Sequence, residues 1–303
     1  MNISSASISL MQSQVLGSLM NSAFGAKRDD SWATVFSLLI PNSAATSTLP
    51  SDPLSLLTQG SNAFLGDSIK GLSLTGRNMA LADPESAYKM MTVINSKDVY
   101  YKAQFSELSQ MKSYVFQMQD AGQNLSSIAL STSNDSIKSQ LQEFAGQYNN
   151  WVQRFNPDIR QGGLLADTQA AEASRFELEQ NINYRFFGVK DGVHGLGDLG
   201  ITIDPNTRLA SLDTFKLDSL LATNKQGVVN TVQEFSANFA KSASLLNSDG
   251  NFVLKQLDNL NRAIHYIADN KDSLQKEFGT GSAAKPAGEV ARALAAYNQV
   301  YAA

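Results

Sequence analysis

The segment whose residues most resemble a reaction site is the run Gly195-Leu196-Gly197-Asp198-Leu199-Gly200, which has the letters of a dinucleotide-binding fingerprint. That fingerprint binds a pyrophosphate only where a strand precedes the glycines and a helix follows them, because the N–H groups of the helix N-terminus hold the phosphates. Here the sequence predicts a helix before the run and a strand after it. We therefore expect a flexible loop that leads into a hairpin, and no nucleotide cofactor.

The histidines offer little to a metal ion. His194 lies in the glycine-rich run and His265 in a predicted helix, and neither has a second histidine at i+4. The chain has no cysteine and no Gly-x-Ser-x-Gly motif, so no activated nucleophile is assembled. The sequence predicts no metal and no cofactor, with both histidines solvated or interfacial.

Acidic and aromatic side chains also occur in groups. Glu172, Glu177 and Glu179 share a predicted helix face with Arg175, which indicates a solvated surface rather than general acid–base chemistry. The aromatic residues that could form a sugar platform have helical spacing, which favours core packing: Tyr148, Trp151, Phe155, Phe186 and Phe187.

We expect that the protein is not an enzyme. A hydrolase would require one acidic residue whose mutation abolishes activity, and the sequence nominates none.

The composition of the chain excludes further classes of function. Only 17% of the residues are charged and the net charge is -4, so there is no basic field for nucleic acid and no polybasic lipid anchor. No window of about 18 consecutive apolar residues predicts a membrane span. The absence of cysteine excludes disulfides and suits a chain that is exported unfolded. The hydrophobic content of 43% is enough for a core.

The first 26 residues form an uncharged, Ser-rich and weakly amphipathic segment that includes Leu10, Val15 and Leu19. It lacks the positive n-region and the continuous apolar stretch of a secretory signal peptide. Substrates of type III export often have such a leader, and an N-terminal helix that packs on a partner is the alternative. Residues 27–82 are rich in Pro, Gly, Ser and Thr, which predicts a linker with short helices.

Residues 83–278 predict long helices with narrow apolar stripes. Asp83-Pro84-Glu85 is a helix start, and a coiled-coil-like stripe of apolar residues follows over 101–128. A second stripe over 137–155 ends at Asn156-Pro157, and a third helix runs from near Asp167 to Gly188. Helices are also expected over 228–246 and 252–278, with a turn at Ser248-Asp249-Gly250.

Residues 279–303 predict a break and a final helix. Glu289 opens this helix, and Val290, Leu294, Tyr297 and Tyr301 recur at steps of four, three and four residues, the spacing of a coiled-coil seam. A helix of about a dozen residues is marginal alone, so we expect it to order against a partner or against the N-terminal segment. Tyr297 and Tyr301 are the aromatic residues that we expect to be functional.

One β-hairpin signal stands between the helical blocks. Ile201 and Ile203 alternate with Thr202, Asp204-Pro205-Asn206-Thr207 supplies the turn, and Leu209 and Leu212 belong to the returning strand. Asp213 then caps a short helix whose apolar side is expected to carry Phe215, Leu217, Leu220 and Leu221. The predicted fold class is mainly α, with long coiled-coil-like helices and a small α+β module containing the hairpin 201–212.

The order of these motifs resembles the C-terminal half of the flagellar filament cap family, also called hook-associated protein 2. The hairpin and short helix carry the resemblance, together with Tyr148-Asn149-Asn150-Trp151-Val152 upstream, Gly163-Leu164-Leu165-Ala166-Asp167, and Leu220-Leu221-Ala222-Thr223-Asn224 with Val228 and Val229 downstream. The resemblance extends from Tyr101 to roughly Asn270. It implies an extracellular component of the bacterial flagellum, exported through the flagellar type III apparatus.

In that family several copies form a plate at the growing tip and guide each flagellin into the lattice. The resemblance therefore implies a structural protein that forms homo-oligomers and contacts flagellin, hook-associated proteins and an export chaperone. The helices at 101–130, 137–155 and 252–278 would form a leg. Residues 1–26 and 289–301 would form the segment that orders on assembly.

One departure separates the chain from the family. Members usually carry a large insertion that forms the plate, and the short span between Ile128 and Tyr148 leaves no room for it. A minimal cap, a hook–filament junction component and an export-stage partner are all compatible with this departure. A type III needle-tip or translocator-like protein, with a chaperone-binding segment in residues 27–82, is a further alternative.

Overall fold

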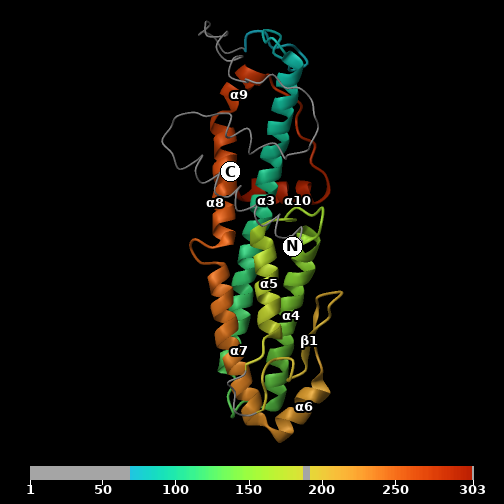
Figure 1. Cartoon of the computed structure of the whole chain (residues 1–303), viewed down its shortest axis with the longest axis vertical. Helices are drawn as coiled ribbons and strands as arrows, with labels where there is room; N and C mark the ends of the chain where they lie inside the picture. The colour runs from blue at the N-terminus through green and yellow to red at the C-terminus, as the bar shows by residue number, and fades with distance from the viewer. Residues whose placement is uncertain (1–68, 187–191, 302–303) are drawn as a thin grey trace, which may run out of the picture. The chain divides into compact units, whose positions relative to one another are not determined.

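The computed structural model describes residues 69–186 and 192–301. In these residues it has eight α-helices and one two-stranded antiparallel sheet, shown in Figure 1. The prediction of a mainly α fold with a small α+β module is confirmed, and supercoiling of the helices stays a prediction. The chain divides into two compact units. Among the described residues, the terminal unit comprises 69–103 and 259–301, and the central unit comprises 104–186 and 192–258.

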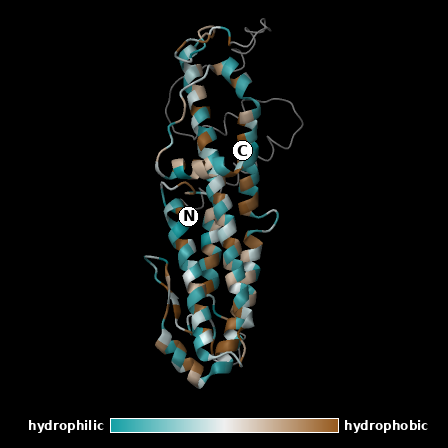
Figure 2. Cartoon of the chain, turned by 180° about the vertical axis from the view of Figure 1, so that it is seen from behind, coloured by the Kyte–Doolittle hydropathy of each residue, from teal (hydrophilic) through white to brown (hydrophobic). Residues whose placement is uncertain are grey.

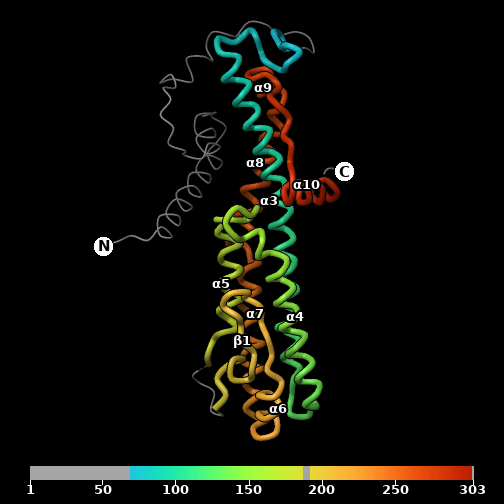
Figure 3. The backbone as a smooth tube through the Cα atoms, turned by 90° about the vertical axis from the view of Figure 1, so that its right-hand side faces the viewer, coloured from blue at the N-terminus to red at the C-terminus, as the bar shows by residue number. Residues whose placement is uncertain are grey.

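The central unit is a group of amphipathic helices. Its members are the second part of α3 (Pro84–Asn124), the 3₁₀ turn η2 (Leu125–Ser127), α4 (Asn134–Ile159), α5 (Gln169–Asn183), α6 (Thr214–Thr223), α7 (Lys225–Leu246) and the start of α8 (Phe252–Asp269). Figures 1 and 3 show α4, α5 and α7 side by side. Hydrophobic and hydrophilic residues alternate along each helix in Figure 2, as helices with one buried face require.

Aromatic rings form the core of the central unit. The ring of Phe144 on α4 meets Phe235 and Phe239 of α7 edge-on, at centroid distances of 5.1 and 5.0 Å. Tyr148 and Trp151 on the same face of α4 are 1% exposed. Such edge-to-face pairs add to the free energy of simple burial. Core packing of the aromatic residues is thus confirmed for all but Phe187, which lies outside the described residues.

A glycine brings α3 and α7 close together. A Cβ atom on Gly122 would lie 2.4 Å from Cδ1 of Phe239, and the hydroxyl of Ser236 donates to the Gly122 carbonyl at 2.8 Å. No real Cβ atom accepts so short a contact, so the ring of Phe239 occupies the space that a side chain would need.

Helix α4 does not stop at Asn156-Pro157, contrary to the prediction, but continues to Ile159. Proline removes one helical hydrogen bond, and tertiary contacts of the last turn compensate for it. Ile159 is buried, and the Asp158 carboxylate accepts from Arg154 at 3.1 Å. Arg154 also donates to Glu107 at 2.5 Å and to Gln110 at 2.9 Å, which ties α4 to α3.

The hairpin was predicted correctly. Strands β1 (Ile201–Ile203) and β2 (Ala210–Leu212) pair antiparallel, with Ile201 opposite Leu212 and Ile203 opposite Ala210. The N–H groups of Thr207 and Asn206 donate to the Asp204 side chain at 2.8 Å each, and these bonds hold the pKa of that carboxyl below its usual value. Asp204 thereby fixes the turn.

The side chain of Asn149 holds the hairpin against α4. Its Oδ1 accepts from the Ala210 N–H at 2.7 Å, and its Nδ2 donates to the Ala210 carbonyl at 2.9 Å. This amide takes the place of a neighbouring strand for one residue of β2. An ion pair between Arg208 and Glu179 of α5, at 2.5 Å, attaches the turn on another side.

Helix α6 begins as predicted, but fewer of its apolar side chains are buried than predicted. The Asp213 side chain accepts from the N–H of Lys216 at 3.1 Å, which confirms the cap. Leu217 and Leu221 are buried, but Phe215 is 87% exposed, so its assignment to the apolar side was wrong. Phe215 lies in the first turn of α6, two residues ahead of the buried Leu217, and residues two apart point to different sides of a helix.

Helix α5 ends at Asn183, earlier than the predicted end at Gly188, which lies outside the described residues. The glycine-rich run that follows has a helix before it and a strand after it, as predicted. It is packed rather than flexible, since Leu196 and Leu199 are fully buried. Gly200, at φ 99°, lies where a Cβ would meet the Asp213 carbonyl at 2.7 Å.

The terminal unit has a smaller core. Its cluster consists of Met91, Ile94, Ile267 and Leu274, with Met90, Tyr101 and Phe278 packed against it. The Asp83 side chain accepts from the Ser86 N–H at 3.0 Å, which confirms the predicted start of α3. The core is small because few buried apolar residues come from each helix.

The helix predicted over 252–278 is two helices, so that prediction was wrong. They are α8, which ends at Asp269, and α9 (Lys271–Phe278). Between them Asn270 donates from its side chain to the Tyr266 carbonyl at 2.9 Å, and such a bond competes with the helical ladder. Residues 279–287 then form the predicted break, and α10 (Gly288–Tyr301) follows.

Candidate interaction site

The predicted seam residues lie on α10, in the terminal unit. Val290 and Leu294 are half-buried and Tyr297 is 9% exposed, whereas Tyr301 is 50% exposed. Val300 beside it is 66% exposed. Leu10, Val15 and Leu19, the other predicted contact residues, lie outside the described residues.

The two tyrosines form one surface. Their ring centroids are 5.1 Å apart at an interplanar angle of 32°. Burial raises the pKa of Tyr297, and the charges of Asp98 and Tyr301 act in the same direction. Figure 1 shows α10 crossing α3, which carries Asp98, and in Figure 3 one end of α10 lies beside α3. The site is thus a partly covered aromatic face beside a carboxylate.

Residues 279–282, here called the strap, are fixed to α3 by polar side chains. Asn95 donates to the carbonyls of Thr280 and Ser282 at 3.0 and 2.9 Å, and the Ser282 N–H donates to the Thr92 hydroxyl at 2.9 Å. The hydroxyls of Tyr88 and Ser282 are 2.7 Å apart. Residues 88, 92 and 95 lie on one face of α3, so this face is a track for the strap.

Glycine allows the strap to lie this close. At Gly281, which has φ +61°, a Cβ would meet the Thr92 nitrogen at 2.6 Å. An L side chain would therefore collide with helix backbone and adopt a strained conformation. The strap depends on Gly281 as much as on the three polar residues of the track.

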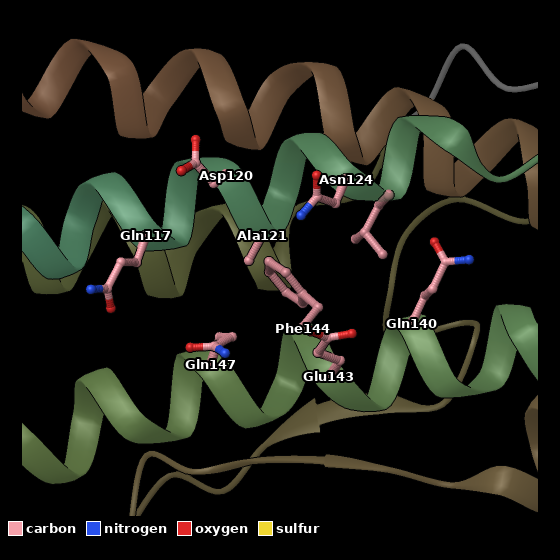
Figure 4. A pocket seen from close by; sticks show the side chains of 9 residues that line it. Gln117, Asp120, Ala121, Asn124, Gln140, Glu143, Phe144 and Gln147 are labelled. Carbon is pink, nitrogen blue, oxygen red and sulfur yellow. The ribbon is translucent and has the colours of Figure 1, made fainter.

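The central unit has a polar groove of about 230 Å³ between α3 and α4 (Figure 4). Ala121, Leu125 and Phe144 form its floor, and its rim consists of Gln117, Asp120, Asn124, Gln140, Glu143 and Gln147. Amides and two carboxylates supply hydrogen-bonding groups but no nucleophile with an adjacent base. The groove resembles a contact surface more than a reaction site.

The residues first considered for chemistry have structural partners. His194 is half-buried, with Nδ1 3.1 Å from the Phe186 carbonyl, and the exposed His265 has Nδ1 2.8 Å from the Asn261 carbonyl. Glu172 pairs with Arg175, but Glu179 pairs with Arg208 of the hairpin turn and its side chain is 24% exposed, so this face of α5 is partly covered rather than solvated. Among residues 69–186 and 192–301, no three His, Cys, Asp or Glu side chains form a group that could hold a metal.

No helix in the described part of the chain is long and apolar enough to cross a membrane.

Sequence reasoning missed the strap and its track. The available signal was the i, i+4, i+7 spacing of Tyr88, Thr92 and Asn95, which places polar residues on one helix face. Without a partner segment, such a stripe is indistinguishable from a solvated face. The partner lies nearly 200 residues away in the sequence, as the separation of 194 residues between Tyr88 and Ser282 shows.

Comparison with known proteins identifies a family. The family model described as "Flagellar hook-associated protein 2 C-terminus" matches residues 114–283, more than half of the chain. No curated protein and no solved structure shows a significant similarity. That family is a structural one of the bacterial flagellum, and the match includes most of the central unit together with α8, α9 and the strap. The chain belongs to the family of the flagellar hook-associated protein 2 C-terminus.

Proposed function

We propose that this chain is a non-enzymatic axial protein of the flagellum that promotes flagellin assembly at the filament tip through non-covalent contacts. The family match over residues 114–283 is the observation that carries the proposal. The protein would be exported through the flagellar type III apparatus and act outside the cell as a homo-oligomer. Its partners would be flagellin, hook-associated proteins and an export chaperone.

The distribution of buried and exposed side chains indicates which parts of the chain make the assembly contacts. The central unit has a dense aromatic core, which suits a rigid body, whereas α10 leaves Val300 and Tyr301 exposed. Exposed apolar side chains on a short terminal helix suit contacts that form and release, because a small interface dissociates faster than a large hydrophobic one. We assign the assembly contacts to α10 and to residues 1–26.

Deletion of the gene in its flagellated host tests the proposal. We expect free flagellin in the medium and absent or short filaments, both reversed by the wild-type gene. Complementation with Tyr301→Asp should fail, and Gln299→Asp on the exposed side of the same helix is the matched control that should succeed. Normal filaments in the deletion strain would refute the cap function.

A second candidate is a hook–filament junction or export-stage partner. The observation that favours it is the connection of residues 128–133 between η2 and α4, which occupies the region where cap proteins of the resembled family carry a plate. For this candidate the deletion would leave flagellin polymerisation intact and change the junction or the amount of exported protein. Quantifying hook-associated proteins in the medium distinguishes the two candidates.

A further inference from the structure

Helix α10 makes little contact with the rest of the terminal unit. Of its fourteen residues only Ala293 and Tyr297 are buried. A helix of this length is marginal in water without tertiary contacts. Its place beside α3 therefore depends on a small contact surface around these two residues.

The surface under α10 contains an unfavourable group. Asp98 Oδ2 accepts from Lys102 Nζ at 2.7 Å, but Oδ1 is buried and has no hydrogen-bond partner among the described residues. Tyr297 lies close enough for the charge of Asp98 to act on its phenol. A buried oxygen without a donor is unfavourable, and it gains water as a partner only where the groups that cover it move away. The contact thus holds α10 while opposing tight binding.

The strap, in contrast, is held firmly. It has hydrogen bonds to Tyr88, Thr92 and Asn95, and its Thr280 N–H donates to the Gly76 carbonyl at 2.9 Å. Between the strap and α10 lie residues 283–287, which have no helix or strand. Five extended residues span about 17 Å, so a released α10 would stay near its seat.

We propose that α10 is a releasable latch: the strap anchors it, its contact through Ala293 and Tyr297 covers part of its apolar side, and release exposes that side for assembly. This inference rests on the proposed function, in which α10 supplies assembly contacts. The latch keeps Tyr297 covered in the single chain and leaves Val300 and Tyr301 exposed for a first encounter. Release then adds Ala293 and Tyr297 to the available surface.

Hydrogen exchange on the isolated full-length chain tests the latch, with mass spectrometry of peptides from α10 and α7. Ala293→Glu places a charge in the buried contact and should speed exchange in 289–301 at least tenfold. Ala295→Glu makes the same change at an exposed position of the same helix and should alter exchange less than twofold. Asp98→Ala removes the unsatisfied oxygen and should slow exchange about threefold. Exchange in α7 should not change, which shows that the chain remains folded.

Two results would overturn the latch. One is wild-type α10 exchanging as fast as an unstructured peptide, and the other is equal exchange in the Ala293→Glu and Ala295→Glu chains. The deletion experiment separates this failure from failure of the proposed function. Normal filaments in the deletion strain together with the predicted exchange pattern would remove the assembly role and leave the latch as a structural fact. Absent filaments without the predicted exchange pattern would support the assembly role and refute the latch.

Discussion

The central and terminal units both use part of α3, yet they bury it differently. In the central unit, Leu108, Met111 and Val115 of α3 are fully buried, and Phe144, Phe235 and Phe239 complete a dense core. In the terminal unit, Met91 and Ile94 belong to a small cluster, and polar residues of α3 hold the strap. One helix thus serves as a core element in one unit and as a track for hydrogen bonds in the other. The difference indicates that buried apolar side chains stabilise the central unit, whereas hydrogen bonds to α3 have a larger part in the terminal unit.

Removing a core ring should affect the central unit most. Phe144→Ala should lower its free energy of unfolding by about 3–5 kcal/mol, because the cavity loses contacts to Phe235 and Phe239. Urea unfolding followed by circular dichroism measures this loss. Phe116→Ala removes a ring that is 55% exposed and should cost less than about 1 kcal/mol. Equal losses in the two variants would mean that the aromatic core does not stabilise the unit.

Breaking the ion network should cost nearly as much. Arg154→Leu leaves the carboxylates of Glu107 and Asp158, whose side chains are 8% and 4% exposed, without their cation, at a cost of about 3 kcal/mol. The terminal unit offers the contrast, because Arg292 is 76% exposed and lies 3.9 Å from Glu289. Arg292→Leu should change stability by less than about 0.5 kcal/mol in the same denaturation experiment. A small effect of Arg154→Leu would show that water reaches the network.

Releasing the hairpin should have a smaller, local effect. Asn149→Ala leaves the N–H and C=O groups of the buried Ala210 without partners, which should destabilise the hairpin by about 2 kcal/mol. Hydrogen exchange in 201–212 should become faster while exchange in α7 stays unchanged. Asn150→Ala, at the exposed neighbouring position, is the control. Unchanged exchange in the Asn149→Ala hairpin would show that Arg208 and Glu179 suffice to hold it.

Alkaline pH should weaken the terminal unit slightly. Burial raises the pKa of Tyr101 to about 12, and the unfolded chain has a value near 10. The unfolded chain therefore loses its proton first, so stability is complete below pH 10 and falls between pH 10 and pH 12. By pH 11 the loss is about 1 kcal/mol. Thermal melts at pH 9 and pH 11 measure it, and Tyr101→Phe should reduce the difference; an undiminished difference would assign it to other groups.

Local signals predicted most of the fold. The caps at Asp83 and Asp213 and the hairpin turn at Asp204 depend on neighbouring residues alone, so their prediction was correct. Pro157 was misjudged because distant contacts sustain the end of α4, where Arg154 bonds to Glu107 and Gln110 of α3. Asn270 was misjudged for a local reason, since its side-chain amide bonds to the Tyr266 carbonyl and divides α8 from α9.

The candidate site was predictable only in part. The spacing of Val290, Leu294, Tyr297 and Tyr301 identified the residues of α10, but periodicity does not tell which of them a helix covers in its own chain. The burial of Tyr297 and the effect of the Asp98 charge on it depend on packing between segments about 200 residues apart. Sequence alone contains no signal for such a pairing.

The missing side chain at Gly122 also affects how α7 can slide along α3 in the central unit. Phe239 occupies the gap there, and one turn away, about 5.4 Å along α3, Met118 has a full side chain. A slide of α7 along α3 by one turn in this direction would drive the Phe239 ring against Met118. The close fit of Phe239 against Gly122 therefore resists sliding of the two helices in this direction.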